Sequence, residues 1–204
     1  NEKVLKLEQW YTEGKLNRDQ GCASIQYNPD GSFYELKWMI NDKFHRLNAP
    51  AEIRYSTKPG RTKESITTKC YFENKLQSYN DQPAVVNRYN NRNLNVSQYE
   101  WYTENKLDRS ADQPAVIKFF DSKEVIIKEQ QWLVDGKLNR NNDRPSIIVY
   151  ALKHNEDGKL AQSSEMKKYE KWYKNNELHR ENDRPALIKY SLEYIKNGLR
   201  NLVE

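Results

Sequence analysis

Apolar and polar residues alternate along many short stretches of the chain, as in the series Ala115, Ile117 and Phe119. A period of two is typical of a β-strand with one face buried. Turn residues such as Asn28 and Gly31 separate these stretches. The pattern therefore predicts an all-β fold built from short strands and tight turns.

The alternating stretches belong to a repeated unit that is marked by tryptophan. Numbering the Trp position as slot 0, a large apolar residue follows at slot +6 in every copy. Cys70 takes the place of Trp in one of the six copies. A fixed pattern of this kind predicts a tandem repeat array. Slot 0 holds Trp10, Trp38, Cys70, Trp101, Trp132 and Trp172, and slot +6 holds Leu16, Phe44, Leu76, Leu107, Leu138 and Leu178.

Slot +4 contains only Gly, Asn or Asp, the residues that tolerate a positive φ. A strand that ends in such a residue and returns at once is a two-residue hairpin with a primed turn. The spacing predicts one such hairpin in each copy. The residues at slot +4 are Gly14, Asp42, Asn74, Asn105, Gly136 and Asn176.

A Pro-Ala pair or a variant of it opens a further strand-like piece in each copy, as at Pro50-Ala51. Equivalent copies in one antiparallel meander need an even number of strands each, whereas three pieces are visible. Either the return strand of the hairpin and the Pro-Ala piece form one bent strand with a bulge, or the array coils. We favour the bent strand. Twelve strands spaced at ~4.8 Å would then make an elongated, twisted antiparallel sheet roughly 50 Å across.

The whole chain, 1–204, is predicted to be a single array. The longest connection, between Leu152 and Lys168, carries a turn signal from Asn155 to Gly158 and predicts longer hairpin flanks there. The degenerate tail is predicted to cap the array, with the start of a damaged seventh copy as the alternative. The predicted copies lie near 4–27, 33–55, 66–89, 97–120, 127–150 and 168–190, with the cap at 191–204.

Composition narrows the setting without naming a function. The 34 basic and 29 acidic residues leave a net charge of +5, which permits an acidic partner but does not require one. No apolar run approaches the ~18 residues of a membrane-spanning helix. Cys22 and Cys70 lie in different copies and give no disulfide framework, so we expect a reducing, intracellular setting.

At Trp172-Tyr173, Leu178-His179-Arg180 and Pro185-Ala186 the chain resembles the MORN-type repeat in the divergent form found in giant DNA viruses. The resemblance spans Trp10 to Tyr190. It implies β-hairpin arrays that serve as scaffolds and attach to proteins or lipids. It implies no enzymatic activity, and it suggests that the protein is associated with the virion of a large DNA virus.

Arginine and histidine columns supply the candidate partner-binding residues. The arginines at slot +8 could bind phosphate or an acidic partner, but we favour ion pairs with the loop aspartate of the same or the next copy, such as Arg180 with Asp183. The two histidines share slot +7, and their wide separation disfavours a metal site. The Trp and Tyr columns could stack on bases, but we favour packing between copies. The candidates are Arg18, Arg46, Arg109, Arg140, Arg180, His45 and His179.

These observations predict a non-enzymatic structural protein that binds other proteins through its repeat surface, within a larger assembly. No cofactor or metal is expected. The alternative is a module that binds nucleic acid or anionic lipid through its Lys and Arg columns. An enzyme is the least supported class, because no acid–base pair, nucleophile arrangement or phosphate loop stands out.

Overall fold

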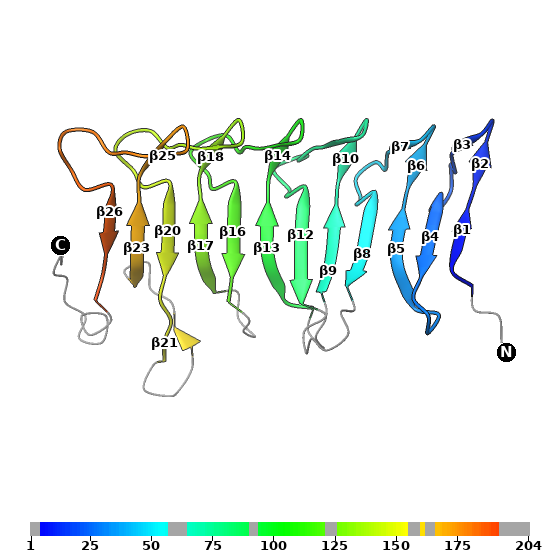
Figure 1. The fold of residues 1–204 in the computed structure, drawn as a ribbon, viewed down its shortest axis with the longest axis horizontal. Helices are drawn as coiled ribbons and strands as arrows, with labels where there is room; N and C mark the ends of the chain where they lie inside the picture. Colours follow the sequence, from blue (N-terminus) through cyan, green and yellow to red (C-terminus); the bar gives the residue numbers. More distant parts are fainter. Residues whose placement is uncertain are drawn as a thin grey trace. The chain divides into compact units, whose positions relative to one another are not determined.

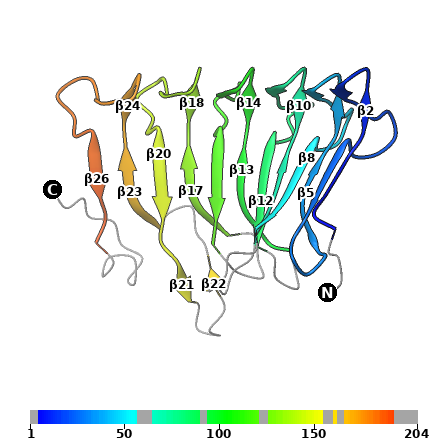
Figure 2. The same cartoon turned by 45° about the vertical axis from the view of Figure 1, so that its right-hand side comes forward.

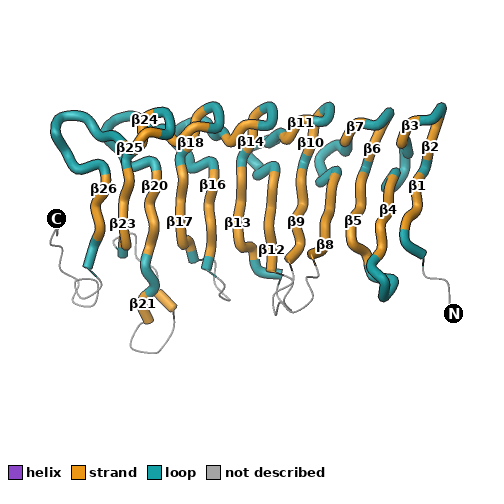
Figure 3. The backbone as a smooth tube through the Cα atoms, in the orientation of Figure 1, coloured by secondary structure: helices purple, strands orange, loops and turns teal. Residues whose placement is uncertain are grey.

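The computed structural model describes residues 5–56, 65–89, 94–120, 126–154, 160–161 and 166–191. Every regular element in this part of the chain is a β-strand, and Figure 3 shows no helix there. Twelve strands form an antiparallel sheet made of consecutive hairpins. The predicted all-β hairpin array is therefore confirmed. The contacts divide the chain into two units, Asn1–Asn105 and Lys106–Glu204, which are described separately.

The sheet of the first unit follows the chain from one strand to the next (Figure 1). Within a copy, the strand before the Trp slot pairs with the strand after the Pro-Ala pair, as in the register Gln9 to Ser24. Because each copy contributes two antiparallel long strands, equivalent strands of successive copies run in the same direction. The strands are β1 (Leu7–Gln9), β4 (Ser24–Tyr27), β5 (Phe33–Lys37), β8 (Glu52–Ser56), β9 (Ser65–Lys69), β12 (Val85–Tyr89) and β13 (Val96–Glu100).

The second unit repeats this scheme. The strand pairs are again antiparallel, with β17 against β20 and β23 against β26. Its strands in the main sheet are β16 (Val116–Phe119), β17 (Ile127–Gln131), β20 (Ile147–Tyr150), β23 (Lys167–Lys171) and β26 (Leu187–Lys189).

Short two-residue strands between the long ones form separate ladders at one end of each unit's sheet (Figure 2). The return strand of each hairpin pairs with the strand that follows Trp, and a loop then leads to the Pro-Ala pair. The predicted bent strand is thus wrong, because the two pieces belong to different ladders. The short strands are β2 (Tyr11–Thr12), β3 (Lys15–Leu16), β6 (Met39–Ile40), β7 (Lys43–Phe44), β10 (Tyr71–Phe72), β11 (Lys75–Leu76), β14 (Tyr102–Thr103), β15 (Lys106–Leu107), β18 (Leu133–Val134), β19 (Lys137–Leu138), β24 (Tyr173–Lys174) and β25 (Glu177–Leu178).

The hairpin turns confirm the primed type predicted from slot +4. Both central residues have positive φ, for example 51° at Asn175 and 73° at Asn176. This combination defines a type I′ turn, whose twist matches that of the strands it joins. A second left-handed pair recurs in the loop before the Pro-Ala pair, at Asn142 with φ of 60° and Asp143 with φ of 52°.

Bulges lie at the opposite end of the long strands, where copies are connected. The register shifts between Gln26 and Tyr27 in β4 and between Val149 and Tyr150 in β20. The long connection after β20 extends the hairpin, because β21 (Lys153–His154) pairs with β22 (Leu160–Ala161). This confirms the longer flanks, while the turn at 155–158 and all of the predicted cap after Ser191 lie outside the described residues.

The buried interior lies where the hairpins meet the long strands. In the second unit Ala115, Val116 and Leu133 form a buried cluster against Leu107 and Leu138. The Ala of the Pro-Ala pair is completely buried in most copies, so only a small side chain fits at that position. Three of the tryptophans are buried and two are half-buried, which confirms the packing role of that column: Trp101 is 5% exposed, Trp132 6% and Trp172 6%, with Trp10 and Trp38 intermediate.

Candidate binding surfaces at the copy junctions

An Asn or Asp at slot +4 connects its hairpin to the preceding one through two hydrogen bonds. The amide of Asn176 donates to the carbonyl of Leu138 over 3.0 Å. Its side-chain Oδ1 accepts from the amide of the same leucine over 2.6 Å. Asp42 makes the same two bonds to Leu16, and we call this arrangement the hairpin bracket. The hairpins therefore form a second hydrogen-bonded layer across the copies of each unit.

The bracket explains why slot +4 prefers Asn and Asp to Gly. A positive φ suits all three residues, but only Asn and Asp carry an oxygen that can accept from the preceding copy. Gly136 keeps its backbone bond to the Leu107 carbonyl, 2.9 Å long, and has no side chain to make the other. Gly14 belongs to the first copy, which has no preceding hairpin in the described chain.

Four arginines at slot +8 lie on the tryptophan of their own copy: Arg18, Arg46, Arg140 and Arg180. The guanidinium carbon of Arg140 is 3.7 Å from the ring centroid of Trp132, and that of Arg180 is 3.9 Å from Trp172. Stacking of this kind adds cation–π attraction to the packing of the ring. The same guanidinium donates to a backbone carbonyl before the Ala slot, as Arg140 does to Pro145 over 3.1 Å.

Arg140 and Arg180 also bind a loop aspartate with both arms of the fork, which confirms a structural Arg–Asp pairing. Arg140 donates to Asp112 over 2.8 and 3.0 Å, and Arg180 donates to Asp143 over 2.7 and 2.9 Å. The aspartate belongs to the preceding copy, so the predicted pairing within a copy or with the next one is wrong. The tryptophan side chain also reaches that loop, since Trp132 Nε1 donates to the Asp112 carbonyl over 2.9 Å.

We call this set of contacts the junction clamp: the Trp and Arg of one copy with the loop Asp of the copy before. A second arginine from the Arg-Pro sequence joins it, because Arg144 also binds Asp112. The hydrogen bond from Arg140 lowers the pKa of the Asp112 carboxyl below its ordinary value, with Arg144 contributing. The carboxylate of the clamp therefore stays ionised, and the guanidinium groups are bound to an aspartate of the same chain.

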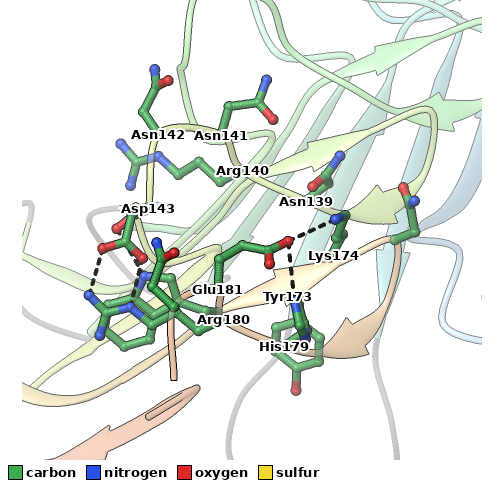
Figure 4. A pocket seen from close by; sticks show the side chains of 13 residues that line it. Asn139, Arg140, Asn141, Asn142, Asp143, Tyr173, Lys174, His179, Arg180 and Glu181 are labelled. Atoms are coloured by element: carbon green, nitrogen blue, oxygen red, sulfur yellow. Dashed lines mark hydrogen bonds and ion pairs between the residues drawn. The ribbon is translucent and has the colours of Figure 1, made fainter. Parts of the chain in front are cut away.

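An open polar pocket of about 390 Å³ lies beside the junction clamp of the last two copies (Figure 4). Glu181 accepts a hydrogen bond there from Lys174 over 2.8 Å, and His179 Nε2 lies 3.2 Å from the same carboxylate oxygen. Bonds from Lys174 and His179 lower the pKa of the Glu181 carboxyl. The lining residues are Asn139, Arg140, Asn141, Asn142, Asp143, Trp172, Tyr173, Lys174, Asn175, His179, Arg180, Glu181 and Asn182.

The pocket is rich in amides and its charged groups are paired with one another. Such a lining can hydrogen-bond to a polar partner, but the described carboxylates hold cations of the chain itself. No group of three His, Cys, Asp or Glu residues suited to a metal ion occurs in the part of the chain that the structure describes.

Two buried carboxylates in the first unit have a structural role. Glu35 and Glu52 have side chains only 7% and 4% exposed, and Arg54 contacts both of them. Burial raises the pKa of the Glu35 carboxyl, but hydrogen bonds from Lys37 and Arg54 outweigh it, so the net shift is downward. Burial and a hydrogen bond to Glu52 raise the pKa of the Tyr71 hydroxyl. These groups hold strands together across one sheet face.

Several exposed apolar side chains lie on the hairpins of the second and third copies or in the loops that follow them. Ile40 is 37% exposed and Phe72 is 55% exposed, and both occupy slot +2 of a hairpin. The His45 ring lies between these slots in sequence order and packs on Phe72, with ring centroids 6.3 Å apart. Leu47 and Tyr79 are exposed in the loops that follow the two hairpins. We call these five residues the hairpin patch.

The predicted site residues thus fall into two groups. The five arginines lie in the loops after the hairpins, where Arg18 and Arg46 stack on Trp10 and Trp38 as the later ones do. The two histidines lie on hairpins, one in the hairpin patch and one in the polar pocket. The structure does not bring the columns together into one site, and their use by a partner stays a prediction.

Sequence reasoning missed the bracket, the second arginine of the clamp and the apolar side chains at slot +2. Arg144 and Arg184 could have been noticed, because both follow the loop Asp and precede Pro. The signal at slot +2 is weaker, since Thr and Lys occupy it in other copies.

No protein-family model, curated protein or solved structure matches this chain. Among the described residues, no helix is long and apolar enough to cross a membrane.

Proposed function

We propose that the protein is a non-enzymatic repeat scaffold that binds other proteins through the outer surface of its hairpins. The observation that carries this proposal is the hairpin patch. Phe72 and Tyr79 are large aromatic residues that are more than half exposed, at 55% and 65%. Exposed apolar groups gathered on neighbouring elements are typical of protein-binding surfaces, and aromatic anchors contribute much of the energy of binding.

The composition of the junctions supports a scaffold over a charged binding module. A nucleic acid or an anionic membrane would need free guanidinium or ammonium groups to neutralise phosphates. Arg140 and Arg180 instead have side chains only 12% and 14% exposed and are bound to aspartates. Two arginines of the column are thus occupied by contacts between copies. By resemblance to the viral MORN-type repeats, we place the scaffold in the virion of a large DNA virus.

The test compares retention of proteins by the immobilised chain and by the variant Phe72→Ser. We expect Phe72→Ser to weaken retention of the partner by about tenfold or more, as for an interface anchor. Val134→Ser is the matched control, because Val134 occupies slot +2 in the second unit and is 50% exposed. Bound proteins are identified by mass spectrometry after mild elution.

A heparin column and anionic vesicles, run over a salt series, test the alternative on the same samples. Steep loss of binding with salt, together with no protein partner, would replace the scaffold proposal by the charged module. Equal retention of the same proteins by Phe72→Ser and the wild type would remove the hairpin patch from the interface.

A further inference from the structure

The two outer strands of the described sheet, β1 and β26, have the two complementary sides that meet at each junction between copies. Inside each unit, the later strand of one copy pairs antiparallel with the first strand of the next, as β8 does with β9 and β20 with β23. Among the described residues β1 pairs only with β4, and β26 only with β23. Within the described residues, the unpaired side of β1 corresponds to the side through which β9 and β23 pair with the copy before, and that of β26 to the side through which β8 and β20 pair with the copy after.

Apolar side chains at these edges are exposed where their internal counterparts are covered. Tyr11 is 57% exposed, whereas Tyr71 and Tyr102 in the same slot are half-buried. Leu178 is 52% exposed, whereas Leu138 in the same slot is half-buried. The difference in exposure follows from the lack of a neighbouring hairpin among the described residues, because the residue in each slot is the same.

The junction clamp is incomplete at both edges among the described residues, with its aspartate at one edge and its arginine at the other. Asp183 occupies the slot of Asp112 and Asp143, yet it forms no ion pair with any described residue. Arg18 stacks on Trp10 and donates to the Cys22 carbonyl over 3.1 Å, and no carboxylate in the described chain binds it. Among the described residues, an anion without an ion-pair partner at one edge therefore complements a cation without one at the other.

We propose that the chain associates head to tail with a second copy of itself. β26 of one molecule pairs antiparallel with β1 of the next, and Arg18 of the second molecule binds Asp183 of the first. The backbone amide of Gly14 donates to the Leu178 carbonyl, as Gly136 does to Leu107. This is a heterologous contact, which uses different surfaces on the two molecules. It does not depend on the scaffold function.

One charge opposes the contact and supplies a sharp test. At internal junctions the residue at slot +5 forms an ion pair with slot +3 of the next copy, as Lys75 does with Glu104 over 3.3 Å and Lys106 with Asp135 over 3.1 Å. Five copies have Lys at slot +5, but the last copy has Glu177. In the proposed contact Glu177 faces Glu13, so like charges meet.

The experiment measures the mass of the 204-residue chain by sedimentation over a concentration series for three proteins. Glu177→Lys and Asp183→Lys change the net charge equally, and both sites are exposed in the last copy. We expect Glu177→Lys to tighten association by up to about fivefold, because a repulsion becomes an attraction. We expect Asp183→Lys to weaken it by about tenfold or more, because a forked ion pair becomes a repulsion.

Hydrogen exchange gives a second readout, since the β26 amides that face β1 of the second molecule should gain protection as concentration rises. A mass that stays monomeric at every concentration would overturn the proposal. So would equal shifts of both variants in the same direction, because these would report net charge alone. Phe72→Ser should leave self-association unchanged, which separates this contact from partner binding at the hairpin patch.

Discussion

Removing one oxygen from the hairpin bracket should loosen the second unit by a predictable amount. Asn176→Gly keeps a residue that accepts the observed φ of 73° but loses the 2.6 Å bond from the Leu138 amide. An exposed neutral hydrogen bond contributes about 0.5–1.5 kcal/mol. Glycine also makes the unfolded chain more flexible, which costs about 0.4–1 kcal/mol, while relief at the positive φ offsets part of this. We expect a net loss of about 1 kcal/mol in the free energy of unfolding.

The reciprocal change is available in the same unit. Gly136→Asn introduces the missing oxygen opposite the Leu107 amide, at a φ of 78° that Asn tolerates and with the nearest atom 3.8 Å from the added Cβ. We expect stabilisation by about 0.5–1 kcal/mol. Asn176→Asp is the control, because Asp42 makes the same bracket in the second copy.

Urea denaturation gives the free energies, and hydrogen exchange at the Leu138 amide reports the bond itself. Protection of that amide should fall in Asn176→Gly and persist in Asn176→Asp. The reasoning is refuted if Asn176→Asp destabilises as much as Asn176→Gly, since the acceptor oxygen would then be irrelevant.

Three further outcomes can be checked on the folded chain. Ala111→Asn should raise the free energy of unfolding by about 0.5–1 kcal/mol, seen as a higher Tm, because Ala111 has a φ of 59° at which Asn is less strained. Trp132→Ala should cost about 3–5 kcal/mol in urea denaturation because the ring is 6% exposed, and a loss below about 1 kcal/mol would contradict its packing role. Lys37 and Arg54 lower the pKa of the Glu35 carboxyl in the folded chain. The ionised carboxyl therefore stabilises the fold at pH values above its ordinary pKa of 4.5, and this stabilisation is lost as the pH falls through the lower folded pKa. Glu35→Gln should therefore flatten the dependence of stability on pH below 4.5, and an unchanged profile would argue against that ionised contact.

Local features of the array could be predicted because they depend on residues close in sequence. The positive φ at slot +4 follows from the limited choice of Gly, Asn and Asp there, and the observed turns agree. The count of twelve main-sheet strands follows from six copies that must all run in the same direction. The bent strand failed because the alternating pattern cannot tell which strand a short piece pairs with, and Lys15–Leu16 pairs within its own hairpin.

Contacts between copies required the tertiary structure. Arg180 is three residues from Asp183 and far along the chain from Asp143, so sequence spacing favoured the wrong aspartate. The strand order places the Arg180 guanidinium beside the loop of the preceding copy, where it donates two hydrogen bonds to the Asp143 carboxylate. The exposure of Phe72 also follows from the hairpins, because slot +2 is exposed in all six copies and Phe72 occupies it.

The sequence by itself determined the repeat, the strands and the turns, since these rest on local backbone preferences and on the alternation of side chains across a strand. The tertiary structure alone decided which copy completes which ion pair and which apolar side chains stay exposed. Those outcomes depend on distances set by strand pairing between copies, and identical slots in neighbouring copies give the sequence no means of choosing among them.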